Sequence, residues 1–316
     1  MPQMTYEDLL TDLCSRNENI VVMTAENRAA IRTLPPKIGN RFIDVGISEQ
    51  TMIGAAAGLA LRGRIPIVHA LATFLTLRGY EFIRTDIGIG NLPVKLVGAV
   101  PGLLSDGNGP THQAVEDVAV MRIIPPMNVF CPADEEDMLI GLPSILQDRS
   151  PWYIRYNSVK PVIEHDPAFE AGRAEIIGDG SDVAFLVYGF LFGETLTAVR
   201  VLESRGIRCR LLNLRTVKPI DQSALLQAAR ECKLLCTVED HFLTGGLYSI
   251  LADILLRNER TAHVLPIALE NRWFKPALLR DVIEFERLTG NDIAAKALDA
   301  LEHTGTALPL TEKLFH

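Results

Sequence analysis

Paired cysteines, clustered histidines and nucleophile motifs are missing from this chain of 316 residues. Its five cysteines are irregularly spaced and form no CxxC pair, so we expect reduced thiols and neither a disulfide framework nor a cysteine zinc site. The seven histidines show no HExxH or HxH spacing, and no GxSxG motif occurs. These absences argue against a zinc centre built by this chain, and we predict that it holds no metal itself.

Positive charge and long apolar runs are also scarce. The formal net charge is −8 and no run of Lys or Arg stands out, which argues against a nucleic-acid partner. No apolar run reaches membrane-spanning length, and the N-terminal stretch MPQMTYEDLL lacks the basic, apolar pattern of a signal peptide. We therefore expect a cytoplasmic protein without a membrane partner.

The chain does contain a regular alternation of apolar strands and helices. With 48% hydrophobic and 22% charged residues, it has the composition of a globular protein with a full core, and its length suits two domains. Strands that are apolar throughout indicate a parallel sheet covered on both faces. The pattern weakens after Asn157, so we predict two consecutive doubly wound α/β domains at 1–160 and 173–316, joined by a linker at 161–172.

One carboxylate lies at a strand–turn–helix junction within residues 41–63. An apolar run at 42–45 ends at Gly46, and a helix rich in small residues starts near Ser48, which places Glu49 at its first turn. The helix dipole stabilises an anion there. Taken alone, Glu49 is most simply a first-turn charge, and its functional interpretation depends on the segments that follow.

A second candidate region is the loop SDGNGPTHQ at 105–113, which follows the apolar strand at 93–100. A loop so rich in Gly, Asp and Asn is typical of a segment that presents side chains, and His112 lies within it. Sites in parallel sheets form at the carboxyl ends of strands, so we expect Glu49 and His112 to converge on one rim. His69 lies inside an apolar strand, where a hydrogen-bonded core histidine is the usual case.

Several motifs in this order resemble those of thiamine-diphosphate enzymes, above all transketolase and 1-deoxyxylulose-5-phosphate synthase. DVGISEQ, TFLTLRGYEFI, DGNGPTHQ, PADEEDM and YIRYNS are similar to the pyrimidine-binding domain, and LLNLRTVKPID and TVEDHFLTGG are similar to the C-terminal domain. The family's N-terminal diphosphate domain, with its Gly-Asp-Gly…Asn metal motif, is absent from these residues. The chain thus resembles the C-terminal subunit of a split, two-chain transketolase.

The resemblance implies a set of cofactor contacts. In the family, a glutamate hydrogen-bonds the N1′ nitrogen of the thiamine aminopyrimidine ring, and this catalytic role falls on Glu49. Phe74, Leu77 and Tyr80 match positions that pack on that ring, and Glu26 matches an acidic position near the cofactor.

The resemblance also implies substrate contacts. His112 matches a catalytic histidine that contacts a donor hydroxyl, and Asn108 stands where the family has a loop aspartate. Asn157 stands where the family has a phosphate-binding arginine, although Arg155 is close by; we count Arg155 and His69 as further substrate candidates. Loss of a cation at a phosphate site favours a modified or differently charged sugar over an ordinary pentulose phosphate.

The expected function is transfer of a two-carbon ketol unit from a ketose to an aldose, with thiamine diphosphate shared with a partner chain that holds Mg²⁺. The partner would be the N-terminal transketolase subunit, in an α2β2 heterotetramer built on a homodimer of this chain. Two alternatives stay open: a β subunit of a 2-oxoacid dehydrogenase E1 component, and a non-enzymatic scaffold that only binds a partner.

Overall fold

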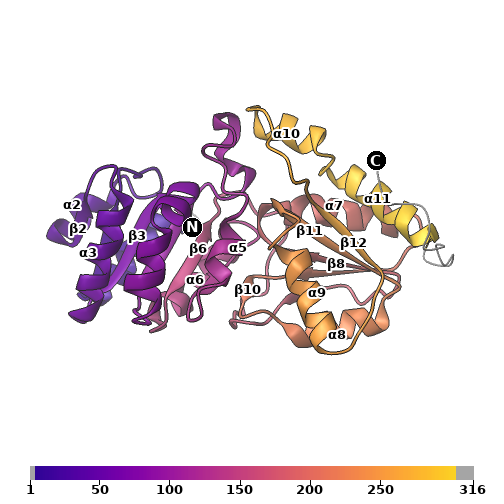
Figure 1. Ribbon diagram of the computed structural model, residues 1–316, viewed down its shortest axis with the longest axis horizontal. Helices are drawn as coiled ribbons and strands as arrows, with labels where there is room; N and C mark the ends of the chain where they lie inside the picture. The colour runs from indigo at the N-terminus through magenta and orange to yellow at the C-terminus, as the bar shows by residue number, and fades with distance from the viewer. Residues whose placement is uncertain (1–3, 304–316) are drawn as a thin grey trace.

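The computed structural model describes residues 4–303 and contains two β-sheets, each with helices on both faces (Figure 1). The strands of the first sheet are, in spatial order, β10 (Thr216–Lys218), β5 (Asn128–Phe130), β6 (Trp152–Tyr156), β4 (Lys95–Ala99), β3 (Ile65–Leu71), β1 (Ile20–Thr24) and β2 (Phe42–Asp44). Those of the second sheet are β12 (Val264–Leu269), β11 (Leu234–Phe242), β8 (Val183–Val187), β9 (Cys209–Asn213) and β7 (Glu175–Ile177).

Most neighbouring strands are parallel, which confirms two consecutive α/β domains. The exceptions lie at sheet edges, where β10 pairs antiparallel with β5 and β7 pairs antiparallel with β9. The first sheet is parallel as predicted except at the edge formed by β10. That edge strand, β10, comes from the C-terminal half of the chain, so the first sheet is completed by residues far away in sequence.

The helices follow the predicted alternation with the strands. In the N-terminal half they are α1 (Tyr6–Arg16), α2 (Leu34–Ile38), α3 (Glu49–Leu61), α4 (Tyr80–Phe82), α5 (Asp117–Arg122) and α6 (Glu135–Gln147), with the short turns η1 (Gly39–Arg41), η2 (Phe74–Arg78), η3 (Ile83–Gly88) and η4 (Leu103–Asn108). In the C-terminal half they are η5 (Gly189–Leu191), α7 (Phe192–Glu203), α8 (Gln222–Glu231), α9 (Leu247–Arg257), α10 (Leu279–Phe285) and α11 (Gly290–His303). No helix within the described residues is long and apolar enough to cross a bilayer.

Both faces of the first sheet are buried, which explains why its strands are apolar throughout. Val22 and Ile67 belong to the core on the face that α1 and α6 cover. Met23 and Val68, the next residues along, belong to the core on the α3 face. The same α3-side core continues into the second unit, where it includes Leu186 of β8.

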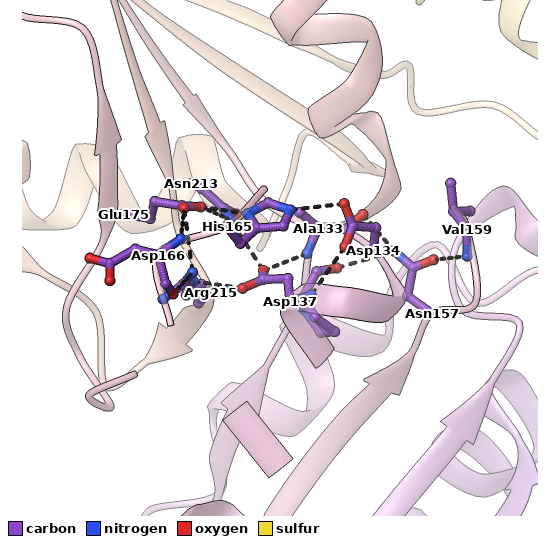
Figure 2. A network of polar contacts seen from close by, with 11 residues as sticks. Ala133, Asp134, Asp137, Asn157, Val159, His165, Asp166, Glu175, Asn213 and Arg215 are labelled. Atoms are coloured by element: carbon purple, nitrogen blue, oxygen red, sulfur yellow. Dashed lines mark hydrogen bonds and ion pairs between the residues drawn. The ribbon is translucent and has the colours of Figure 1, made fainter. Parts of the chain in front are cut away.

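The predicted linker carries no helix or strand, but it is packed into the junction between the two units (Figure 2). The buried His165 ring lies 2.8 Å from Asp134 through Nε2 and 2.8 Å from Glu175 through Nδ1. Burial would lower the pKa of His165, but the hydrogen bonds to Asp134 and Glu175 outweigh it and raise the pKa to about 10. The junction therefore holds an imidazolium between two carboxylates.

Candidate active site

The turn that precedes α3 is organised by the carboxylate of Asp44 at the end of β2. Asp44 Oδ1 accepts a hydrogen bond from the backbone N–H of Gly46 (2.9 Å) and another from that of Glu26 (3.3 Å). Arg28 donates to the same carboxylate through Nε (2.8 Å). Gly46 has a φ of +71°, a conformation that favours glycine. These contacts fix the direction in which α3 leaves the sheet.

Glu49 is the first residue of α3 and is only 3% exposed. The preceding Ser48 makes no side-chain hydrogen bond to the helix, so the start of α3 has no conventional side-chain cap. The Glu49 carboxylate instead lies in the positive field of the helix N-terminus and pairs with Arg78, whose Nη1 is 3.1 Å from Oε1. A buried anion is thus held at the predicted position.

A pocket of about 520 Å³ opens beside Glu49 at the carboxyl ends of β1 and β3. It is lined by Ala25, Glu26, Asn27, Arg28, Ala29, Arg32, Ile47, Glu49, Leu71 and Phe74. Three residues expected to contact the cofactor, Glu26, Glu49 and Phe74, are therefore brought together. Their location agrees with the rule that sites in α/β sheets form at the carboxyl edge.

The Phe74 ring connects Glu49 to the loop that carries His112. The Cζ atom of Arg78 lies 3.7 Å from the Phe74 ring centroid, and the His112 ring centroid lies 5.0 Å from it at an interplanar angle of 65°. The structure thus brings His112 next to the wall of the pocket, as predicted. Arg78 was not among the residues predicted from the sequence, although its spacing of four residues from Phe74 favours a shared helix face.

The loop that presents His112 is held from the C-terminal half of the chain. At its base, the backbone N–H of Leu103 donates to Asp240 Oδ2 on β11 (3.4 Å). At its tip, Asp106 Oδ1 accepts a hydrogen bond from the N–H of Leu279, 2.5 Å away at the start of α10. The loop includes η4, which contacts α10. Figure 1 shows α10 next to the segment that projects above the first unit. The second unit therefore positions a loop of the first.

Three other predicted contacts point elsewhere. Leu77 is 44% exposed, and Tyr80 is half-buried against the α3-side core; neither is among the residues that line the pocket. Asn108 is exposed, and its Nδ2 donates to the carbonyl of Ser105 (2.8 Å). Cofactor or substrate roles for these three residues stay predictions.

His69 is buried and is not among the residues that line the pocket. Its Nε2 is 2.8 Å from the Tyr6 hydroxyl, and its Nδ1 is 3.3 Å from the carbonyl oxygen of Met23. Burial lowers the pKa of His69 to about 4, so the ring is neutral and both nitrogens are hydrogen-bonded. This geometry fits the core interpretation and gives no support to a substrate role.

Arg155 likewise faces other protein groups. It is 2% exposed, with Nε 2.9 Å from Asp117 and Nη1 2.9 Å from Asp240, so it bridges the two units. Asn157 uses its Nδ2 to donate to the carbonyl oxygens of residues 132 and 133. The geometry supports neither residue as a phosphate contact, and the predicted substrate role of Arg155 stays untested.

The pocket fits the pyrimidine half of thiamine diphosphate. It offers a buried carboxylate, Glu49, for a ring nitrogen and an aromatic side chain, Phe74, for packing on a flat heteroaromatic. Within residues 4–303, metal-ligand spacing is found for Asp137, His165 and Glu175, which lie at the domain junction and not at the pocket. None of these three residues lines the pocket, whose side chains suit the organic ring.

Comparison with known families agrees with this architecture. Residues 3–159 match the transketolase pyrimidine binding domain, and residues 172–293 match the transketolase C-terminal domain. These two matches define a class of α/β proteins in which a pyrimidine-binding domain precedes a transketolase C-terminal domain. The chain belongs to the transketolase family, which confirms the resemblance and implies dependence on thiamine diphosphate.

Individual relatives are both separate subunits and longer chains. The chain is 36% identical over 259 residues to the 6-deoxy-6-sulfo-D-fructose transketolase subunit SqwH of Clostridium sp. (strain MSTE9), covering 80% of each. It is 34% identical over 310 residues to 1-deoxy-D-xylulose-5-phosphate synthase of Thermomicrobium roseum, spanning 96% of this chain and 49% of the synthase. A split gene transketolase solved as an inactive beta4 tetramer superposes with a TM-score of 0.85 at 32% identity, covering 94% of this chain and 97% of that one.

Proposed function

We propose that this chain is the C-terminal, pyrimidine-binding subunit of a two-chain transketolase. The enzyme moves a two-carbon ketol unit from a ketose donor to an aldose acceptor. The observation that carries the proposal is the buried Glu49 carboxylate at the start of α3, in a pocket it shares with Phe74 and next to His112.

Three residues in or beside the pocket have separate tasks. Thiamine diphosphate, when bound, supplies the carbon nucleophile that cleaves the ketose. Glu49 holds the proton shared with the N1′ nitrogen of the pyrimidine, and Phe74 packs on the ring and excludes water. His112, at the edge of Phe74, orients a hydroxyl of the donor.

The partner chain supplies the other half of the cofactor site. Two observations support this: the pocket residues form no metal set within residues 4–303, and a chain of a split gene transketolase is matched over 97% of its own length. A separate N-terminal subunit would hold the diphosphate and Mg²⁺, with the cofactor between the chains. A relative described as a transketolase subunit covers a similar length.

The donor is a ketose that carries an anionic or otherwise modified end. Arg28 and Arg32 both line the pocket, but Arg28 is paired with Asp44. Arg32 is exposed and forms no ion pair with any residue in the range 4–303, so its guanidinium is available to an anion. The predicted phosphate position, Asn157, is committed to backbone carbonyls.

The test is Glu49→Gln in the complex with the partner subunit and thiamine diphosphate. We expect a loss of ketol transfer of roughly 10²-fold or more, because positioned acid–base catalysis typically contributes ~10²–10⁴-fold. Glu81→Gln removes an exposed carboxylate from α4 and serves as the control for the change in charge.

Near-wild-type ketol transfer by the Glu49→Gln complex would remove this residue from the mechanism. Assays with ketose phosphates and sulfonated ketoses beside 2-oxoacids separate the transketolase from the dehydrogenase alternative. Activity on 2-oxoacids alone would overturn the transketolase proposal, and a partner complex unable to bind thiamine diphosphate would favour the non-enzymatic scaffold.

A further inference from the structure

We propose that Arg78 is a displaceable place-holder for the pyrimidine ring, and that cofactor binding requires its side chain to swing out of the pocket mouth. The inference rests on the proposed function, because it assumes that Glu49 and Phe74 receive a pyrimidine. Arg78 would act on cofactor binding by occupying the positions next to those two residues.

The guanidinium of Arg78 contacts both groups that a pyrimidine would need. Its Nη1 lies 3.1 Å from Glu49 Oε1, and its Cζ lies 3.7 Å from the centroid of the Phe74 ring. A planar cation at this distance covers one face of the ring and hydrogen-bonds the carboxylate beside it. A flat heteroaromatic that stacks on Phe74 and shares a proton with Glu49 would take the same two positions.

A second ring also contacts Phe74. The His112 ring packs against Phe74 at a centroid distance of 5.0 Å and an angle of 65°. Phe74 is therefore engaged by Arg78 and His112 together. A ligand that stacks on the ring face covered by Arg78 must displace Arg78, and this also frees the Glu49 carboxylate.

Opening requires a side-chain rotation and no movement of the backbone. Arg78 ends η2, and the next residue, Gly79, is packed so tightly that a β-carbon there would overlap the Ile53 side chain and the carbonyl of Leu75. The Arg78 side chain itself is 46% exposed, whereas Glu49 is 4% exposed in its side chain. A half-exposed arginine can rotate into solvent on the nanosecond scale or slower, while the groups beneath it stay in place.

Binding kinetics distinguish a place-holder role of Arg78 from a role as a contact of the bound cofactor. If binding requires an open state, the apparent affinity and the association rate both fall by the fraction of open molecules. A residue that touches the bound cofactor acts mainly on the dissociation rate instead. Half-exposed ion pairs and cation–π contacts are individually weak, so we expect an effect of roughly tenfold.

The experiment compares the wild type, Arg78→Gln and Arg84→Gln, each as the full chain in complex with its partner subunit at a constant Mg²⁺ concentration. Arg84 is an exposed arginine on the same helical segment and does not line the Glu49 pocket. Stopped-flow fluorescence with thiamine diphosphate gives the association and dissociation rates. We expect Arg78→Gln to associate roughly tenfold faster with an unchanged dissociation rate, and Arg84→Gln to match the wild type.

Two results would overturn the place-holder while leaving the proposed function intact. One is equal association rates in the wild type and Arg78→Gln; the other is faster dissociation from Arg78→Gln, which would make Arg78 a contact of the bound cofactor. Absence of thiamine diphosphate binding in all three complexes would overturn both proposals. Arg78→Lys keeps the charge but loses the planar stacking group, and an intermediate association rate is expected.

Discussion

The histidines of this chain illustrate how the local environment decides the role of one residue type. His69 is held between Tyr6 and the Met23 carbonyl, and burial lowers its pKa to about 4. His112 instead lies half-buried on a loop, with its ring against Phe74 and Nδ1 2.9 Å from the Thr111 hydroxyl. A group that can reach a ligand must keep one polar atom free of the core, and His112 meets this condition.

His112→Ala should lower kcat/KM for the ketose donor by about 10- to 100-fold, because it removes one hydrogen bond to a donor hydroxyl. The affinity for thiamine diphosphate should stay within about threefold of the wild type, since the Glu49 carboxylate is untouched. Steady-state assays with isothermal titration calorimetry measure the two quantities. His263→Ala, at an exposed position, is the matched control. An unchanged kcat/KM would contradict the donor role.

The connecting segment between the two units functions as a structural element despite having no helix or strand. Around His165 it gathers Asp134 at the start of α6, Glu175 of β7 and, on the neighbouring chain segments, Asp137 and Arg215 (Figure 2). Arg215 Nε lies 2.6 Å from Asp137 Oδ1. Buried charges of opposite sign stabilise a junction only while each keeps its partner, so loss of one member leaves a buried carboxylate unpaired.

His165→Gln should destabilise the fold by about 3–5 kcal/mol at neutral pH, the usual effect of breaking a buried ion pair. The pKa of His165 is raised from 6.5 to about 10 in the folded state, so its proton stabilises the protein fully below pH 6.5. That stabilisation is lost as the pH rises through about 10. The difference in unfolding free energy between the wild type and the variant should therefore shrink across this range.

Urea unfolding at several pH values measures that difference, and His263→Gln controls for the loss of an exposed histidine. The charged groups around His165 are Asp134, Asp137, Glu175 and Arg215. A difference that is constant with pH would mean that His165 is not charged in the folded protein.

At the scale of the whole molecule, the two units are joined by the α3-side core and by buried ion pairs. The α3-side core includes residues of both sheets, and Arg155 links Asp117 of the first unit to Asp240 of the second. Large apolar side chains nevertheless stay exposed at or beside the pocket: Ile47 (70%) lines it, and Leu77 (44%) precedes Arg78, which pairs with Glu49. Exposed apolar residues beside a functional site favour coverage by another chain.

We expect the isolated chain to self-associate and to lack ketol transfer, and addition of the partner to give a complex of two copies of each chain. Ile47→Asp should weaken this association by placing a charge on the covered surface. Leu256→Asp, at a residue of α9 that is 76% exposed, should have no effect. Sedimentation velocity measures the assembly. A stable monomer that ignores the partner would contradict the proposal.

Much of the architecture is encoded locally. The uninterrupted apolar strands predicted sheets buried on both faces, and the pattern at Gly46, Ser48 and Glu49 predicted a carboxylate at a helix start. Topology then placed Glu49 and the His112 loop at one edge, because parallel strands end on the same side. The apolar periodicity of strands and helices can be read from the sequence because it depends only on which face of each element is buried.

Contacts between distant segments were decided by the tertiary structure. The pairing of Arg78 with Glu49, the burial of Arg155 between two carboxylates and the addition of β10 to the first sheet join residues far apart in the chain. A polar side chain carries no local mark of its partner, because charge and hydrogen bonding act through space after the elements have packed. The sequence therefore predicted the edge of the sheet where the pocket lies. The tertiary structure determined which candidate side chains face the pocket and which are already paired with other protein groups.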